Sequence, residues 1–326
     1  VIEWAHDPDA GKGAKPMVLP RFVVTARAVR SLAAVLITGW TFDAGAVSLV
    51  AQVSGHNEAI RRSVRQVARE QVEREALRAT DRYLEAWNSR NPTAWAHTLH
   101  FPHVRPGVGS FRVINTAKDY ARGVNFERTL STGWHRSQWT SYDVFQVGPT
   151  KAHVAGHYSR YDSAGEQIRT TFVTYVVTKQ GSRWGIQSRF AAGGADVSAL
   201  RRVALATTAV AAVEAYFAAF NDPTDAAGWA ATLNYPHVRV ADGTVEVWKT
   251  AEAYLTGLQP GRQRTWVRTR LDWAESVQVG RGGVNVAVRF SRLNRQGDTL
   301  SSYEAVYLVT TRDGHVGIQA RSSFAP

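Results

Sequence analysis

Histidines are the side chains of this sequence best suited to proton transfer, because the imidazole pKa lies near neutral pH. The part of the chain after residue 80 contains eight of them: His97, His100, His103, His135, His153, His157, His237 and His315. Six of the eight lie before residue 160, so pocket chemistry is expected there. If the protein is an enzyme, we expect His135 to be the base, with His103 and Tyr120 as its hydrogen-bonding partners.

Structural roles compete with these catalytic assignments. His103 and Arg105 alternate with Val104 along a predicted strand, so their side chains share one face. A hydrogen-bonded structural role is favoured for His103. Tyr120 ends a short predicted helix, where a core aromatic is favoured over a donor to an oxyanion.

No metal or cofactor site is predicted. His97, His100 and His103 are spaced by three, but Pro102 interrupts the helix and the three side chains do not share one helical face. The chain has no cysteine, which excludes thiolate ligands and disulfides. No Gly-rich phosphate loop or nucleophile elbow occurs in the sequence.

The aromatic residues suggest a binding pocket. The chain has 11 tryptophans, and tryptophan provides an apolar wall with one polar tip, which suits a flat apolar ligand. The residues predicted to bind the ligand are Trp134, Trp95, Arg105, His237, Tyr254 and Trp266. Arg189 and Arg321 could hold an acidic ligand or a carboxylate of the other half of the chain, and the carboxylate is the favoured interpretation.

An internal repeat organises these residues. The octapeptide TLHFPHVR at 98–105 returns as TLNYPHVR at 232–239. The similarity extends to further segments, which pair 83–95 with 216–229, 133–148 with 265–280, and 174–189 with 306–321. Two domain-sized copies indicate a tandem duplication and exclude a solenoid. The predicted organisation is an extension at 1–56, a leading helix at 57–79, domains at 80–194 and 207–326, and a linker at 195–206.

Each copy predicts the same order of elements. Helical periodicity comes first, then a hairpin, a short third helix with Thr116 or Thr250 as its N-cap, and three or four long alternating strands. This order predicts an α+β fold in which three N-terminal helices pack on a curved antiparallel sheet. We expect two tandem cone-like domains that pair sheet to sheet as a pseudo-dimer.

The N-terminus resembles a secretory signal. Basic residues after Met17 precede an apolar stretch at 31–42 and a small-x-small site at 44–46, so 17–46 could be a signal peptide. Asp43 directly follows the apolar stretch and weakens this interpretation, so a cytoplasmic location is favoured over export, and an extra packed segment is the alternative. No other run approaches 18 apolar residues, and no transmembrane span is predicted.

The charge is basic and uneven. The net charge is +12, and residues 80–195 carry 14 Lys or Arg against 7 Asp or Glu. A nucleic-acid surface needs its cations gathered on one face, whereas these arginines are scattered along predicted strands and loops. Nucleic-acid binding is therefore not expected.

The sequence resembles the nuclear transport factor 2-like superfamily, and its SnoaL-like branch is the nearest. The resemblance rests on the order of elements, the PHVR corner, the Gly-Trp-His at 133–135 and the closing WGIQSRF at 184–190. The resemblance covers nearly all of 80–326 and implies a deep pocket between helices and concave sheet. Members include isomerases, polyketide cyclases, dehydratases, epoxide hydrolases and non-catalytic binders, and many pair their sheets as dimers. The enzymes typically use a pocket carboxylate, for which no diagnostic motif occurs here.

Two functions follow from this resemblance and from the residues. The first is a small-molecule pocket protein that binds an apolar or aromatic ligand without catalysis. The second is a cofactor-free isomerase, cyclase or dehydratase that uses a pocket histidine of the first domain. Fold alone does not decide between them.

Overall fold

The structure is a computed structural model that describes residues 44–107, 111–241, 243–257 and 266–325. The chain divides into two compact units, Val1–Glu58 and Ala59–Pro326, and both repeats belong to the second. The signal-like segment at 17–46 lies almost entirely outside the described residues, whereas residues 44–56 of the predicted extension are helical. Helix α1, Ala44–Asn88, is continuous, so the predicted domain boundary at residue 80 falls inside it.

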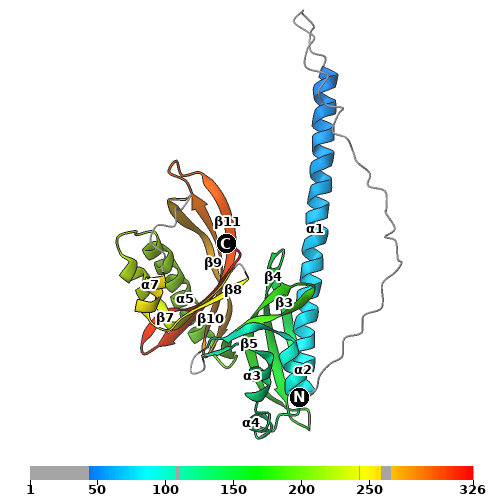
Figure 1. Cartoon of the computed structure of the whole chain (residues 1–326), viewed down its shortest axis with the longest axis vertical. Coiled ribbons are helices and arrows are strands. Elements are labelled where there is room, and N and C mark those ends of the chain that lie inside the picture. Colours follow the sequence, from blue (N-terminus) through cyan, green and yellow to red (C-terminus); the bar gives the residue numbers. More distant parts are fainter. Residues whose placement is uncertain (1–43, 108–110, 242, 258–265, 326) are drawn as a thin grey trace, which may run out of the picture. The chain divides into compact units, whose positions relative to one another are not determined.

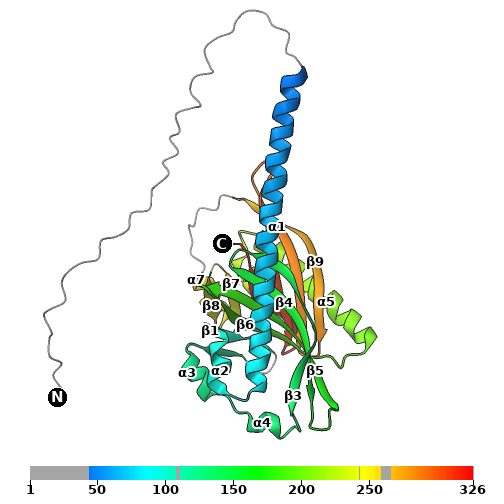
Figure 2. The ribbon, with the colours of Figure 1, turned by 90° about the vertical axis from the view of Figure 1, so that its right-hand side faces the viewer.

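The first repeat combines the C-terminal part of α1 with three short helices and six strands. Its helices after α1 are α2 (Pro92–His97), α3 (Ala117–Arg122) and α4 (Glu127–Leu130). Its strands are β1 (Leu99–Arg105), β2 (Arg112–Ile114), β3 (Arg136–Gly148), β4 (Lys151–Tyr161), β5 (Gln167–Gln180) and β6 (Arg183–Gly194). The strands form one sheet in the order β2-β1-β6-β5-β4-β3. Helices α2 and α3 lie side by side at one end of this repeat (Figure 2).

The second repeat has the same plan. Its helices are α5 (Ala199–Phe220), α6 (Ala226–Ala231) and α7 (Ala251–Gly257), and Figure 1 labels α5 and α7. Its strands are β7 (Leu233–Ala241), β8 (Thr244–Trp248), β9 (Arg268–Gly280), β10 (Gly283–Leu293), β11 (Thr299–Arg312) and β12 (His315–Ser323). The sheet order β8-β7-β12-β11-β10-β9 reproduces that of the first repeat. The predicted α+β class and the tandem duplication are therefore confirmed, and the predicted linker is helical from Ala199 onward.

Local sequence explains where these elements begin. The Thr116 side chain accepts a hydrogen bond from Asp119 N at 3.1 Å, and the Thr250 side chain accepts one from Ala253 N at 3.1 Å. Both are the N-caps that the sequence predicts for the third helices. Capping fixes the start of each helix and therefore the placement of Tyr120 and its counterpart Tyr254.

The repeated octapeptide adopts a different conformation from the predicted one. The sequence places Pro102 at the end of the second helix, whereas α2 ends earlier and Pro102 lies within β1. Strand β1 pairs with β6 in parallel, with a register shift between Leu99 and Val104. A proline is tolerated at such an irregularity because no ladder hydrogen bond is required of it there. The sheet is consequently mixed and not purely antiparallel.

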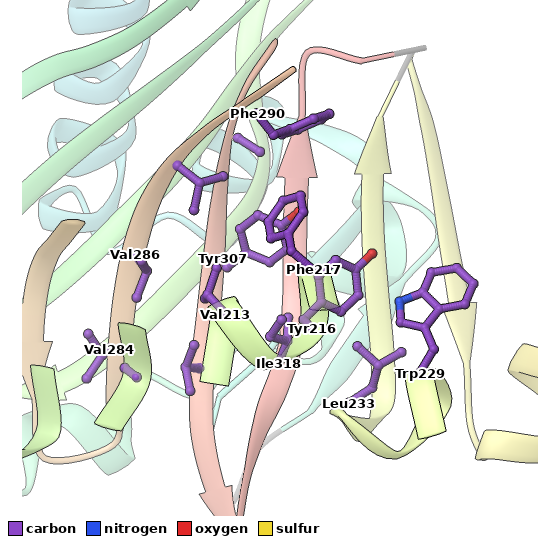
Figure 3. Packing of buried hydrophobic residues seen from close by; sticks show 14 of the residues in the cluster. Val213, Tyr216, Phe217, Trp229, Leu233, Val284, Val286, Phe290, Tyr307 and Ile318 are labelled. Carbon is purple, nitrogen blue, oxygen red and sulfur yellow. The ribbon is translucent and has the colours of Figure 1, made fainter. Parts of the chain in front are cut away.

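The core of the second repeat is closed by α5. Figure 3 shows Val213, Tyr216 and Phe217 of this helix against side chains of β10, β11 and β12. By length and composition α5 is apolar enough to cross a membrane, which the sequence analysis did not anticipate. Its buried residues, Ala209, Val213, Tyr216 and Phe217, belong to the core of this repeat.

The two sheets pack against each other within the second unit. A cluster of buried side chains joins Val104, Val176 and Phe190 of the first repeat to Val238, Val306 and Leu308 of the second. Equivalent glutamines add hydrogen bonds across the contact: Gln146 Nε2 donates to Ala305 O at 3.0 Å, and Gln278 Nε2 donates to Gly156 O at 2.9 Å. This reciprocal arrangement is the predicted intramolecular pseudo-dimer.

One interface position breaks this symmetry. His153 is fully buried, with Nδ1 at 2.6 Å from Gln146 Oε1 and Nε2 at 2.8 Å from Ser322 Oγ. The equivalent residue of the second repeat is Asn285, which donates to Phe190 O at 3.0 Å. Burial and the nearby Lys151 hold the pKa of His153 well below its usual value, so this histidine is neutral in the fold.

Candidate functional site

Three hollows of the described surface contain polar side chains. A groove of about 490 Å³ lies between the repeats, bordered by residues 147–151, 178–180 and 302–304. A second hollow of about 660 Å³ is bordered by residues 132, 160, 167–170, 194–196 and 281, and we call it the vestibule. The third, of about 40 Å³, lies inside the first repeat, and we call it the inner cavity.

The inner cavity is lined by aromatic and cationic side chains. Its lining residues are Tyr83, Leu84, Trp87, Trp95, Arg105, Tyr158, Arg160, Tyr175 and Arg189. They come from α1, α2, β1, β4, β5 and β6, so almost every layer of the first repeat contributes. No carboxylate is among these lining residues.

Two polar atoms of this lining, Trp95 Nε1 and Arg160 Nε, are buried without a hydrogen-bond partner in the described structure. Both groups can only donate. Buried polar groups are normally paired, so a cavity with free donors complements an acceptor-rich group.

Arginines face one another across two strand pairs of the first repeat. Arg105 lies directly opposite Arg112 in the β1–β2 ladder, and Arg160 lies directly opposite Arg169 in the β4–β5 ladder. Like charges placed directly opposite each other destabilise a sheet. Among the described residues no carboxylate forms an ion pair with any of these four arginines or with Arg189. The first repeat therefore concentrates uncompensated positive charge.

The second repeat has no like-charge pair at the equivalent positions. Arg239, the counterpart of Arg105, lies opposite Glu246 and its Nη1 is 2.6 Å from Glu246 Oε2. Arg292, the counterpart of Arg160, lies opposite Ser301, and its guanidinium carbon is 3.8 Å from the centre of the Trp266 ring. The like-charge pairs are thus a property of the first repeat and not of the fold.

A histidine–arginine pair differs in the same way. In the second repeat His237 Nδ1 donates to Ile318 O at 2.9 Å, and Nε2 accepts from Arg321 Nε at 3.3 Å. In the first repeat His103 Nδ1 donates to Ile186 O at 3.2 Å, but Nε2 has no partner in the described structure.

Arg189, the counterpart of Arg321 in the first repeat, has a different hydrogen-bonding partner. Arg189 Nη2 donates to the Tyr158 hydroxyl at 2.8 Å, and the residue equivalent to Tyr158 in the second repeat is Phe290. The extra hydroxyl therefore accounts for the different position of this guanidinium. The favoured expectation that Arg189 and Arg321 hold a carboxylate of the other half is wrong, because each bonds within its own repeat.

Electrostatics set the protonation of Tyr158. Burial alone would raise the pKa of its hydroxyl, but the guanidinium groups of Arg189, Arg160 and Arg105 lower that pKa to about 8. The pKa of Arg189 is raised, because nearby tyrosines outweigh the effect of burial. Tyr158 is therefore a group beside the cavity whose charge changes close to neutral pH.

The predicted base does not lie at this cavity. His135 is exposed just before β3, where its carbonyl oxygen accepts from Arg90 Nη2 at 2.9 Å. The neighbouring Trp134 is buried, and its Nε1 donates to Ser137 Oγ at 2.9 Å. The Gly-Trp-His segment thus divides between core and solvent, because only the tryptophan points inward.

Four other predicted residues of the first repeat do come together. Arg105 and Trp95 line the inner cavity, and Arg105 Nη1 is 3.4 Å from the Tyr120 hydroxyl. The ring centres of His103 and Tyr120 are 5.5 Å apart. Burial and Arg105 lower the pKa of His103 to about 3, and burial raises the pKa of Tyr120. Both therefore stay neutral at physiological pH.

The predicted residues of the second repeat do not line any of the three hollows described above. His237 and Tyr254 are buried with ring centres 5.8 Å apart, and burial and Arg321 lower the pKa of His237 to about 3. The Tyr254 hydroxyl is buried without a partner in the described structure. Trp266 is half-buried and stacks with Arg292. Within the described residues no cluster of three or more His, Cys, Asp or Glu is arranged to hold a metal.

Sequence analysis missed Arg160, Arg169, Tyr158 and Tyr175. A signal was present, because the repeat alignment places Tyr158 against Phe290 and Arg169 against Ser301. Differences in arginine and tyrosine between the copies, and not those in histidine alone, therefore mark this part of the first repeat.

Comparison with known families agrees with this geometry. The family model described as NTF2-like protein (DUF6841) matches residues 73–192, which run from α1 into β6. The first repeat is a nuclear transport factor 2-like domain. The second repeat has the same strand order, which fits the tandem duplication that the sequence predicts.

Solved structures match about one repeat of the chain. An NTF2-like protein with a cystatin-like fold from Novosphingobium aromaticivorans is 16% identical, with a TM-score of 0.35, and the match covers 45% of this chain and 94% of that one. An NTF2-like protein of unknown function from Shewanella oneidensis is 17% identical, with a TM-score of 0.30 and coverage of 35% and 93%. A Catenulispora acidiphila protein in complex with S-DNPA is 13% identical, with a TM-score of 0.30 and coverage of 36% and 89%. Curated protein sequences give no significant match.

Proposed function

We propose that the first repeat binds a small organic anion whose acidic group enters the inner cavity. The observation that carries this proposal is the set of three cavity arginines, Arg105, Arg160 and Arg189, with no carboxylate in the lining. Arg189 is buried and Arg105 and Arg160 are partly buried, and a cation that loses water without a paired anion is costly. A bound carboxylate or similar oxyanion supplies the missing charge.

The walls of the cavity favour an aromatic acid. Trp87 and Trp95 have ring centres 4.6 Å apart, and Tyr83 and Tyr175 have ring centres 5.3 Å apart, so these rings pack on one another and form an apolar wall. An apolar wall beside guanidinium groups suits the carboxylate end of an aromatic acid, because guanidinium groups bind carboxylates in a planar, two-pronged geometry. The proposal keeps the predicted aromatic ligand and adds a negative charge to it.

The test compares benzoate with benzamide, which is similar in shape but neutral. Isothermal titration calorimetry is expected to detect benzoate binding and at least tenfold weaker binding of benzamide, because charge-assisted hydrogen bonds are about twice as strong as neutral ones. Arg105→Gln is expected to weaken benzoate binding about tenfold. The matched control is Arg239→Gln in the second repeat, which should leave benzoate affinity unchanged.

Equal affinity for the two compounds would contradict the proposal, as would equal losses in the two variants. Circular dichroism of both variants separates loss of binding from loss of fold. A binder that prefers benzamide would point back to an apolar pocket.

Proton-transfer catalysis is the second candidate, supported by Tyr158. A cofactor-free isomerase, cyclase or dehydratase needs a group that exchanges a proton near neutral pH. The pKa of His103 is about 3, which makes it a weak base, whereas the pKa of Tyr158 is about 8. In this alternative Tyr158 replaces His135 as the acid–base residue. Tyr158→Phe would then abolish turnover of any substrate found while benzoate binding is retained.

A further inference from the structure

The inner cavity has room for a head group but not for a whole ligand. Its volume is about 40 Å³, whereas pockets for small molecules typically hold about 300–1,000 Å³. If an acidic group occupies the cavity, as in the proposed function on which this inference rests, the rest of the ligand must lie outside it. The position of the exit therefore defines the remainder of the site.

Arg160 connects the inner cavity to the vestibule. It is the one side chain that lines both hollows. Its guanidinium carbon lies 5.6 Å from the centre of the Trp87 ring, and its Nε is buried without a partner in the described structure. The vestibule, at about 660 Å³, has the volume that the inner cavity lacks.

The vestibule is positively charged. Arg169 lies directly opposite Arg160 in the β4–β5 ladder, and Arg281 also lines this hollow. Asp196 is the only acidic residue among the lining, and it pairs with Arg281. Three cations against one anion favour a second acidic group on the ligand.

Both repeats build this hollow. Arg281 belongs to the β9–β10 turn, where Arg281 N donates to Gly194 O at 3.0 Å and Gly282 N donates to Ala192 O at 2.8 Å. Gly193 has a φ of 95°, and a Cβ there would lie 2.9 Å from Gly282 N, so only glycine allows this approach. The backbone contact holds Arg281 of the second repeat beside the first repeat.

We propose that the vestibule is the outer half of the binding site and takes the second acidic group of an elongated aromatic diacid. Arg160 lies along the middle of this ligand, and Arg169 and Arg281 bind its outer carboxylate. The site is thus incomplete in a single repeat. This assigns the tandem arrangement a part in recognition as well as in stability.

The test uses two compounds that differ by one carboxylate, 4-phenylbutanoate and 4-(3-carboxypropyl)benzoate. Calorimetry on the full chain is expected to give at least fivefold tighter binding of the diacid. Arg169→Gln and Arg281→Gln should each weaken the diacid about three- to fivefold, as expected for partly exposed ion pairs, without changing the affinity for 4-phenylbutanoate. Exposed Arg268 of β9 provides the control Arg268→Gln, which should affect neither compound.

The outcomes separate this inference from the proposed function. If neither compound nor benzoate binds, the inner anion site fails and this inference falls with it. If 4-phenylbutanoate binds and the diacid binds no better, the inner site stands and the outer site is overturned. A diacid preference that survives both substitutions would also overturn it, because the second carboxylate would then lie elsewhere.

Discussion

The two repeats share a strand order and a framework of histidine, arginine and tyrosine, yet they differ in polarity or charge at three aligned positions. Tyr158 stands against Phe290, and the first repeat has Arg112 and Arg169 where the second has an acidic and a neutral residue. Each difference makes the first repeat more polar or more positive. The second repeat pairs its equivalent arginines within the fold or stacks them on aromatic rings.

This comparison distinguishes what the fold requires from what the first repeat adds. A buried histidine bound to the carbonyl of a strand residue occurs in both copies, so it supports the fold. Arginines that face each other across a strand pair occur in the first copy and have no counterpart in the second. Residues retained at a cost to stability commonly serve function. The second repeat therefore acts as an internal control for the first.

The largest expected effect concerns pH and the asymmetric interface residue His153. Its pKa is lowered in the fold, so below pH 6.5 the unfolded chain binds the proton and the folded chain does not. The free energy of unfolding is therefore independent of this histidine above about pH 6.5. Below that pH it falls with acidification, by about 1.4 kcal/mol per pH unit for each such histidine.

His153→Asn, which copies Asn285 of the second repeat, tests this expectation. Urea unfolding between pH 6.5 and 5 should show a slope against pH reduced by about 1.4 kcal/mol per unit relative to the unsubstituted chain. An unchanged slope would mean that the histidine is not held neutral at the interface.

Tyr158→Phe copies the second repeat at the inner cavity. In the unsubstituted chain, the rise in phenolate absorbance at 295 nm should include one tyrosine near pH 8, and the variant should lack it. A bound anion and the tyrosinate compete for the same guanidinium groups. Benzoate affinity should therefore be highest and constant below pH 8 and fall about tenfold per pH unit above it. This fall should be absent in the variant.

The same variant tests the position of Arg189. Without the hydroxyl, its guanidinium should bind His103 as Arg321 binds His237, so unfolding free energy should change by less than about 1 kcal/mol. A loss of several kcal/mol would show that this repeat cannot adopt the arrangement of the second.

Exchanging the charges at the aligned hairpin positions Arg112 and Glu246 should change the stability of the chain by a smaller amount. Arg112→Glu creates the pair that Arg239 and Glu246 form in the second repeat, and it should stabilise the chain by about 1 kcal/mol. Glu246→Arg should destabilise it by about the same amount. Thermal unfolding in low salt measures both, and high salt should reduce both effects. Shifts of the same sign in the two variants would refute a charge-based explanation.

Arg169→Ser should have the smallest effect on stability. It copies Ser301 and removes the like charge opposite Arg160, so unfolding free energy should rise by a few tenths of a kcal/mol, about 0.3 kcal/mol. Arg122→Ser on α3 is a control that should not stabilise the chain, because Arg122 pairs with Asp119. Destabilisation by Arg169→Ser would indicate that the arginine contributes a contact other than repulsion.

Much of the fold could be predicted from the sequence because it depends on local patterns. The repeated octapeptide, the turn residues and the period-two strands indicated two α+β copies, and Thr116 and Thr250 act as the predicted caps. The conformation at Pro102 could not be predicted in this way. It depends on parallel pairing with β6, a strand about eighty residues away.

The site was less predictable than the fold. Arg105, Trp95, His103 and Tyr120 come together as a group, while His135 is exposed. A one-residue difference in strand register moves a side chain to the opposite face, so composition alone does not place a residue in a cavity.

The amino-acid sequence by itself determined the duplication, the order of elements and the positions at which the two copies differ. The tertiary structure alone decided which of those differences meet. Arg160 faces Arg169 because β4 and β5 pair in that register, and Arg189 bonds Tyr158 because β4 and β6 both flank β5. These contacts join residues distant in the chain, and long-range pairing is a property of the folded sheet and not of any local segment.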